Sequence, residues 1–375
     1  MKPHRFLMRL LGVALVMTCY VCFADDTAKP AAPASSAPAA PAAKPAVAAN
    51  PAEAAKNAKP AKAPEPVKPP DEAKLRATLT KSLGFLAKEN EAWMEEKGCN
   101  SCHHLPELIW THREAKRRGF PVDQKKFDEW VAWANNEAPK KAGGSQEAAF
   151  LLLANPEQPA PDTIKTVAAE QRPNGSFPGQ GQFSGAQQRG GADADATTLR
   201  VFLLALASAP DAKAEADAAL AKAAPLLQKK DPPTTVESQV FRILFAERFG
   251  KTQEADALRA QILKLQRGDG GWSYIIGANQ SDPWATGEAL YVLHASSNLQ
   301  TADAVARAQH WLLSQQGEDG SWPLGFSYIS KGDRSGPEKA KSRKDATRIY
   351  TAFATDWATL GLLQAIPVKE AVAAK

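Results

Sequence analysis

The stretch LQRGDGGW, at Leu265–Trp272, decides how the rest of this sequence is interpreted. Its pattern recurs as EQRPNGSF at Glu170–Phe177 and as SQQGEDGSW at Ser314–Trp322. Each copy has a glutamine, two variable residues, aspartate or asparagine, glycine, a small residue and an aromatic residue. Such a recurrence predicts one structural unit used several times, and units of this kind must stack to bury their apolar faces.

Each copy has the features of a turn between two helices. The glutamine ends an apolar helical pattern, where its amide can bind the free backbone groups of a helix end. Asp-Gly or Asn-Gly makes the turn because glycine tolerates positive φ, and the aromatic side chain then packs back between helices. The sequence therefore predicts that Trp272 and Trp322 are buried at equivalent turns of helical hairpins.

A second shared element follows each turn, in which an acid precedes Ala-Thr and an apolar helix begins. The three segments are DADATTLRVFLLAL from Asp193, SDPWATGEALYVL from Ser281 and TDWATLGLLQAI from Thr355. A carboxylate in this place can accept from the free N–H groups of the first helical turn and complements the helix dipole. We therefore expect Asp282 and Asp356 to be the N-caps of the helices that follow.

These units resemble the QW repeats of the squalene-hopene cyclase and prenyltransferase superfamily. The resemblance extends over about Asp71–Ile366. It implies an all-α fold, an α/α toroid in which inner and outer helices alternate around a central cavity. The stretches between the turns have helical periodicity, with no convincing alternation typical of strands. The predicted organisation is a signal peptide at 1–24, an Ala/Pro/Lys-rich disordered linker at 25–70 and the toroid at 71–368.

The two N-terminal segments predict export and a tether. A basic start with Lys2, Arg5 and Arg9 precedes an apolar run too short for a comfortable membrane span, as in secretory signal peptides. We expect a periplasmic or secreted protein, with an uncleaved anchor as the alternative. The linker has too few large apolar side chains to offset its ordering entropy. The formal net charge is +5, with the two signs interspersed, which gives no case for nucleic-acid binding.

The same resemblance raises the question of a catalytic acid. Class II terpenoid cyclases share an Asp-x-Asp-Asp motif, whose middle carboxylic acid protonates the substrate. The nearest match here is DADAT at Asp193–Thr197, where Asp195 takes the place of that acid and Ala196 replaces the last aspartate. Helix capping is the alternative, and we favour it over catalysis for Asp195. The zinc site of the protein prenyltransferases has no matching cysteine in this chain.

The stretch EKGCNSCHH, from Glu96, carries a different motif. Cys99, Cys102 and His103 match the attachment motif of c-type haem, in which two thiols add to the vinyl groups and the histidine ligates iron. After loss of the predicted signal peptide, the mature chain keeps no other cysteine. The sequence therefore predicts one covalent haem c, with a redox disulfide, a zinc site and chance as alternatives.

The second haem ligand is less defined because no methionine follows the motif. We expect His112 on the next helix as the distal ligand, with Met94 as the next candidate and His310 as a packed core histidine. The predicted function is an exported c-type haem protein that performs electron transfer or haem-based redox chemistry with an unknown redox partner and holds a hydrophobic small molecule. The alternatives are a terpenoid or hopanoid-type cyclase that uses Asp195, and a non-catalytic binding or scaffold protein. Whether the protein is an enzyme is left open.

Overall fold

The computed structural model describes the helical part of the chain. The residues described are 66–98, 105–141, 145–159, 162–177, 191–229, 231–294, 299–325 and 336–369. The chain divides into two units, Met1–Pro66 and Val67–Lys375, and every described element lies in the second. The predicted signal peptide and most of the predicted linker lie outside the described residues.

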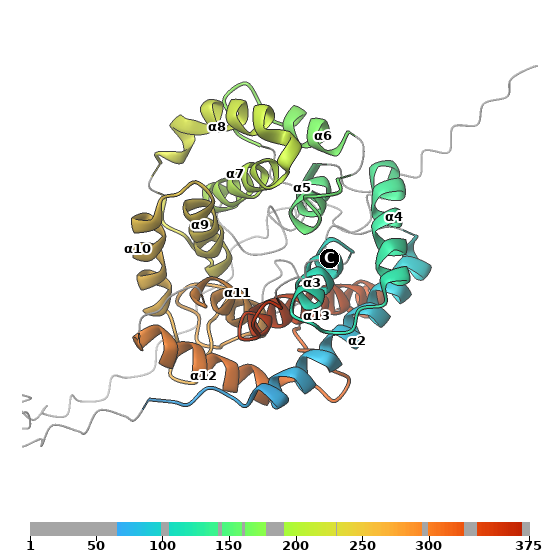
Figure 1. Cartoon of the computed structure of the whole chain (residues 1–375), viewed down its shortest axis with the longest axis vertical. Coiled ribbons are helices and arrows are strands. Elements are labelled where there is room, and N and C mark those ends of the chain that lie inside the picture. The colour runs from blue at the N-terminus through green and yellow to red at the C-terminus, as the bar shows by residue number, and fades with distance from the viewer. Residues whose placement is uncertain are drawn as a thin grey trace, which may run out of the picture. The chain divides into compact units, whose positions relative to one another are not determined.

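The second unit is a double ring of helices (Figure 1). The inner ring consists of α3 (Leu105–Arg117), α5 (Ser145–Ala154), α7 (Gly191–Ser208), α9 (Val236–Arg248), α11 (Pro283–Leu293) and α13 (Ala340–Leu363). The outer ring consists of α2 (Glu72–Lys97), α4 (Gln124–Lys141), α6 (Thr163–Ala169), α8 (Lys213–Leu227), α10 (Thr252–Leu263) and α12 (Leu299–Gln315). A short 3₁₀ turn at Pro210–Ala212 leads into α8, and another at Pro337–Lys339 leads into α13.

Each inner helix packs against the next one in the chain, and α13 returns to pack against α3. This contact closes the ring and confirms the predicted all-α toroid. The described residues contain isolated β-bridges, such as Trp272 with Asp282, and no named strand. No helix in this described part combines the length and apolarity that a membrane crossing requires.

The two rings differ in how much of each helix they bury. Outer helix α10 buries a single stripe, Ala255, Arg259 and Ile262, at the spacing of one helical face. Inner helix α11 buries nearly its whole length, from Pro283 to Leu293, because the outer ring covers one side and its neighbours cover the others. The apolar run in its sequence is therefore a consequence of its place in the inner ring.

The turn at Gln266–Trp272 holds two successive outer helices together. The Gln266 side-chain amide donates to Gly270 O, at 2.9 Å, and to Ala304 O of α12, at 2.8 Å. Trp272 is fully buried, and its Nε1 donates to Ile262 O of α10, at 2.8 Å. Gly270 has φ 95°, and a Cβ there would lie 3.0 Å from a carbonyl oxygen of α12, so the turn requires glycine.

The third copy of the turn closes the outer ring. Gln316 donates to Gly320 O and to Thr78 O of α2, both at 3.0 Å, and so joins α12 to the start of the fold. Trp322 is fully buried and donates from Nε1 to Leu312 O, at 2.8 Å. The predicted burial of Trp272 and Trp322 at equivalent turns is confirmed.

The first copy has the same arrangement without the indole bond. Gln171 donates to Gly175 O, at 3.1 Å, and to Ala219 O of α8, at 2.8 Å. Phe177 is 1% exposed, as buried as the two tryptophans, but its ring has no N–H to donate. The glutamine contacts are thus common to all three copies.

The capping prediction is confirmed for Asp282. Its Oδ1 accepts from Ala285 N, at 2.8 Å, at the start of α11. Its Oδ2 accepts from Tyr274 N, at 2.5 Å, in the preceding loop. Burial raises the pKa of this carboxyl to about 7, although backbone N–H groups work against the rise.

The capping prediction for Asp356 is wrong, because this residue lies deep inside α13. Trp322 N donates to Thr355 Oγ1, at 3.0 Å, as Trp272 N donates to Thr286 Oγ1, at 2.9 Å. The Ala-Thr pair equivalent to that of α11 is therefore the one that ends at Thr355. The sequence prediction used the pair one helical turn later, since α13 contains both.

Helices α11 and α13 cross at a pair of glycines. A Cβ on Gly287 would lie 2.3 Å from the backbone of Trp357, and one on Gly361 would lie 2.4 Å from Gly287 O. The two inner helices therefore approach as closely as their backbones permit. Trp284, one turn before Gly287, and Phe353, one turn before Trp357, are thereby placed in direct contact.

Candidate functional site

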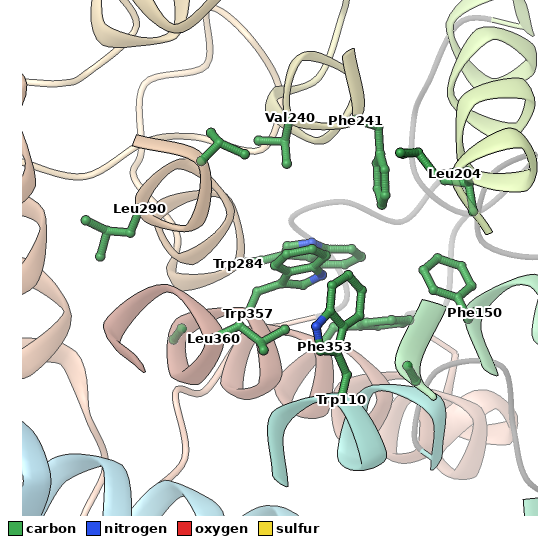
Figure 2. Packing of buried hydrophobic residues seen from close by; sticks show 14 of the residues in the cluster. Trp110, Phe150, Leu204, Val240, Phe241, Trp284, Leu290, Phe353, Trp357 and Leu360 are labelled. Atoms are coloured by element: carbon green, nitrogen blue, oxygen red, sulfur yellow. The ribbon is translucent and has the colours of Figure 1, made fainter. Parts of the chain in front are cut away.

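Aromatic side chains from several inner helices meet inside the toroid (Figure 2). Trp110 of α3, Tyr291 of α11 and Trp357 of α13 are within contact of one another, with ring centroids 5.7, 5.8 and 5.9 Å apart. Phe241 of α9 packs edge-on against Trp357, at 6.4 Å. These four residues are called the aromatic cluster below.

A second aromatic contact lies beside this cluster, at the crossing of α11 and α13. Trp284 and Phe353 stack with centroids 4.7 Å apart and planes 15° apart, and they are called the stacked pair. The Trp284 Nε1 donates to Glu288 on the same helix, at 2.9 Å, so its only polar atom is satisfied. The faces of such rings carry negative charge density and attract cations.

Three carboxyl groups are buried on three inner helices that are neighbours in the ring. Glu107 of α3 and Glu147 of α5 are each 2% exposed, and Asp356 of α13 is fully buried. Burial, with a further contribution from Glu147, raises the pKa of Glu107 to about 8. Burial, with a further contribution from Glu107, raises the pKa of Asp356 well above its ordinary value. Glu107 and Asp356 are called the acid pair below.

The acid pair lies along the same helix faces as the aromatic side chains. Phe353, Trp357 and Leu360 follow one face of α13, and Asp356 belongs to that stripe by its helical spacing. Glu107 stands one helical turn before Trp110 on α3. Within the described ranges, no three His, Cys, Asp or Glu side chains are arranged to hold a metal ion. The arrangement suits proton chemistry beside an apolar surface.

The predicted catalytic acid Asp195 lies on inner helix α7. It is inside the helix and exposed, so it does not cap α7 as we had favoured. Thr197 Oγ1 donates to Asp193 O, at 2.9 Å, as Thr286 Oγ1 donates to Asp282 O, at 2.7 Å. Asp195 therefore occupies, on α7, the position that Trp284 of the stacked pair occupies on α11.

Asp193 of the same motif has a structural role. It is 3% exposed, and its Oδ2 accepts from Thr234 Oγ1, at 2.7 Å, and from Thr234 N, at 3.2 Å. Thr235, the N-cap of α9, also reaches this oxygen, at 3.4 Å. Asp193 thus connects the first turn of α7 to the segment that starts α9.

A surface cavity of about 490 Å³ lies beside α12. Its lining mixes polar and apolar groups, among them Gln280, Trp311 and Leu324. None of its lining residues belongs to the aromatic cluster, the stacked pair or the acid pair. We therefore take the inner face of the toroid as the candidate site.

The residues predicted to hold haem fall partly outside the described structure. Cys99, Cys102 and His103 lie outside the described residues. His112 is 5% exposed, its Nδ1 lies 2.9 Å from Leu108 O, and its ring packs on Trp130. Burial lowers the pKa of His112 to about 4. His112 is thus a packed core histidine.

Met94 and His310, the other two residues considered near the predicted haem, both lie in the described structure. Met94 is partly buried and packs against the hydrophobic core. His310, which we had expected in the core, is exposed, and its Nε2 lies 2.9 Å from Lys68 O. The sequence pattern around His310 could not distinguish a core-facing position from a place on the outer rim of α12.

Comparison with known proteins connects this architecture to terpenoid cyclases. Residues 211–375 match the family model of the squalene-hopene cyclase C-terminal domain. A curated relative, drimenyl diphosphate synthase of Streptomyces showdoensis, is 27% identical over 203 residues, which cover 48% of this chain and 35% of the relative. The chain thus matches about a third of the length of that relative, and both likenesses are to terpenoid cyclases.

Solved structures share the fold. A possible member of the GH105 family from Klebsiella pneumoniae is 13% identical with a TM-score of 0.51, covering 81% of this chain and 95% of that one. A second possible member, from Salmonella enterica, is 15% identical with a TM-score of 0.50, covering 81% and 96%. A type II terpene cyclase from Scytonema is 14% identical with a TM-score of 0.49, covering 79% and 98%.

These findings overturn the predicted cofactor. The matched family and the curated relative are terpenoid cyclases, and the described residues hold no metal-binding group. The predictions of a covalent haem c, a c-type cytochrome and an electron-transfer role are therefore wrong. A five-residue motif is short enough to occur without its cofactor, whereas the repeats that define the toroid recur three times.

Proposed function

We propose that this protein binds an isoprenoid chain against the inner face of its toroid and cyclises it after protonation. The observation that carries the proposal is the aromatic cluster, formed by four side chains from four inner helices. The match of residues 211–375 to a cyclase domain and the relative named for a terpenoid diphosphate product support the same chemistry.

The chemistry needs a proton, an apolar surface and stabilisation of positive charge. Addition of a proton to the terminal double bond of an isoprenoid forms a C–H bond and leaves a tertiary carbocation. The next double bond attacks this cation, a ring closes, and loss of a proton ends the reaction, so the net change is an isomerisation. Aromatic faces stabilise the passing cation and exclude water that would quench it.

The motif match makes Asp195 one candidate for the source of the starting proton. In support, Asp195 lies on an inner helix, in the position that Trp284 holds on α11. Against this role, Ala196 stands where the cyclase motif has its last aspartate, and Asp195 is exposed. The role of Asp195 stays a prediction that Asp195→Asn tests by its loss of turnover.

The proposal is tested by product analysis. Purified protein is incubated with farnesyl diphosphate, geranylgeranyl diphosphate and squalene, and the organic extract is analysed by gas chromatography with mass spectrometry. We expect a cyclic isomer from at least one of them. Trp357→Leu keeps apolar volume but loses the aromatic face, so turnover should fall. Trp130→Leu removes a buried tryptophan of outer helix α4 and is the matched control.

A binding protein without turnover is the second candidate, favoured by the exposure of Asp195 and the missing last acid of its motif. Quenching of tryptophan fluorescence by an isoprenoid, with no cyclic product, would support it. Absence of both quenching and product would refute the proposed site. Export through the signal peptide predicted at 1–24 remains part of the proposal, and fractionation of a producing cell tests it.

A further inference from the structure

We propose that Asp356 supplies the proton that starts cyclisation and that the carboxyl group of Glu107 keeps this donor protonated, an inference that rests on the proposed function. Neither residue belongs to the motif that resembles the cyclase acid. Asp356 entered the sequence interpretation only as a helix cap, a role that α13 excludes.

Asp356 has the burial and the surroundings of a functional group. It is fully buried, and neither of its carboxyl oxygens has a hydrogen-bond partner in the described part of the chain. Phe353 and Trp357, which precede and follow it in the sequence of α13, point to the toroid interior (Figure 2). A proton leaving this carboxyl group would therefore enter the aromatic surroundings that the carbocation needs.

Glu107 is the charged group that acts on Asp356, because it contributes to the raised pKa of that carboxyl. It lies on α3, which packs against α13, and neither of its buried oxygens has a hydrogen-bond partner in the described part of the chain. Two carboxyl groups that act on each other in an apolar site do not both ionise, so at least one keeps its proton. A negative charge on Glu107 therefore favours the protonated form of Asp356.

Asp282 gives the contrast within the same protein. It is as buried as Asp356, but both of its oxygens accept backbone N–H groups at a helix start and a loop. Its burial is explained by those bonds. The burial of Asp356 and Glu107 gives the fold no comparable bond, and unpartnered buried carboxyl groups destabilise a folded chain. Their presence is therefore explained better by chemistry than by stability.

A proton donor must carry its proton before the reaction, and burial favours that form of both acids. Burial raises the pKa of Glu107 to about 8 and the pKa of Asp356 well above its ordinary value. In the reaction the O–H bond of Asp356 breaks and a C–H bond forms at the alkene terminus. The Asp356 carboxylate is reprotonated when the final C–H bond of the product breaks.

Turnover of variants tests the assignment. Asp356→Asn keeps the shape but cannot release a proton, so turnover should fall by about a hundredfold or more. Glu107→Gln should lower kcat and leave KM unchanged, because it acts on the proton donor rather than on substrate binding. Glu237→Gln is the matched control: Glu237 is also a buried inner-ring acid, but it accepts from the Tyr274 hydroxyl, at 2.9 Å. It should keep wild-type turnover.

The outcomes separate the two claims. If Asp356→Asn turns over at the wild-type rate while Asp195→Asn does not, the donor is Asp195 and the proposed function stands. If the wild type gives no cyclic product, the proposed function fails and the donor role with it.

Infrared spectroscopy tests the acid pair without substrate. The wild type at pH 7 should show a carbonyl band of protonated carboxylic acid that weakens in Asp356→Asn and in Glu107→Gln but not in Glu237→Gln. A band unchanged in both variants would overturn the inference even if the protein is a cyclase. Circular dichroism of each variant confirms that the comparison is between folded proteins.

Discussion

Gln316→Ala should weaken the ring at the point where its two ends meet. The side-chain amide of Gln316 donates to Gly320 O in its own turn and to Thr78 O of α2. Each hydrogen bond contributes roughly 1 kcal/mol net, so removing both costs about 2 kcal/mol. Unfolding entropy is about 2.1 cal/mol/K per residue, or roughly 0.6 kcal/mol/K for a unit of this size, so Tm should fall by about 3 °C.

The neighbouring residue provides the control for this measurement. Gln315 is exposed, and its amide reaches only Ser314 Oγ, at 3.1 Å. Gln315→Ala should therefore change Tm by less than about 1 °C. Gln316→Glu keeps the shape but sets a carboxylate against two carbonyl oxygens, so it should lower Tm more than alanine does. Thermal melting followed by circular dichroism measures all three. Equal melting of Gln316→Ala and Gln315→Ala would show that the turn glutamine does not hold the rings together.

Three further predictions concern the helix crossing, the acid pair and the aspartate motif. Gly287→Ala should destabilise the protein by about 1–3 kcal/mol in a urea titration, because its Cβ meets the backbone of α13. The control Gly84→Ala has open space around its Cβ and should be neutral or stabilising. Burial raises the pKa of the Glu107 carboxyl from 4.5 to about 8, so its contribution to the free energy of unfolding is complete below pH 4.5 and is lost as pH rises through about 8. Glu107→Gln should flatten that decline. An unchanged pH profile of stability would show that Glu107 is not buried as described. Asp193→Ala should lower the free energy of unfolding by about 1–3 kcal/mol, since it leaves the Thr234 and Thr235 donors unpaired. Asp195→Ala should change it by less than about 0.5 kcal/mol, because Asp195 is exposed and caps nothing. A loss of about 1 kcal/mol or more in Asp195→Ala would contradict this placement.

Local signals carried the prediction of the repeat turns. The Gln266 amide binds a carbonyl oxygen within its own turn, and Trp272 reaches back to the helix just before it. Contacts of such short range follow from the order of residues alone, because the chain has few ways to satisfy them. The same is true of Asp282, whose carboxylate caps the helix that begins next to it.

The error at Asp356 shows where local patterns stop being sufficient. Helix α13 contains two Ala-Thr pairs one turn apart, and both fit the repeat equally well as sequence. The pair in use is the one that Trp322 N contacts through Thr355, from a turn more than thirty residues earlier. Nothing in the local sequence indicates which of the two pairs that distant turn contacts.

The sequence by itself determined the helical hairpins and the turns that join them, because these depend on periodicity and on contacts within about ten residues. The tertiary structure alone decided which residues close the ring, with Gln316 reaching α2, and that Asp356 and Glu107 are buried within it. An acid inside an apolar helix has the same sequence whether water or other helices cover it. What raises its pKa is removal of water by segments distant in the chain, and only the folded arrangement determines which segments those are.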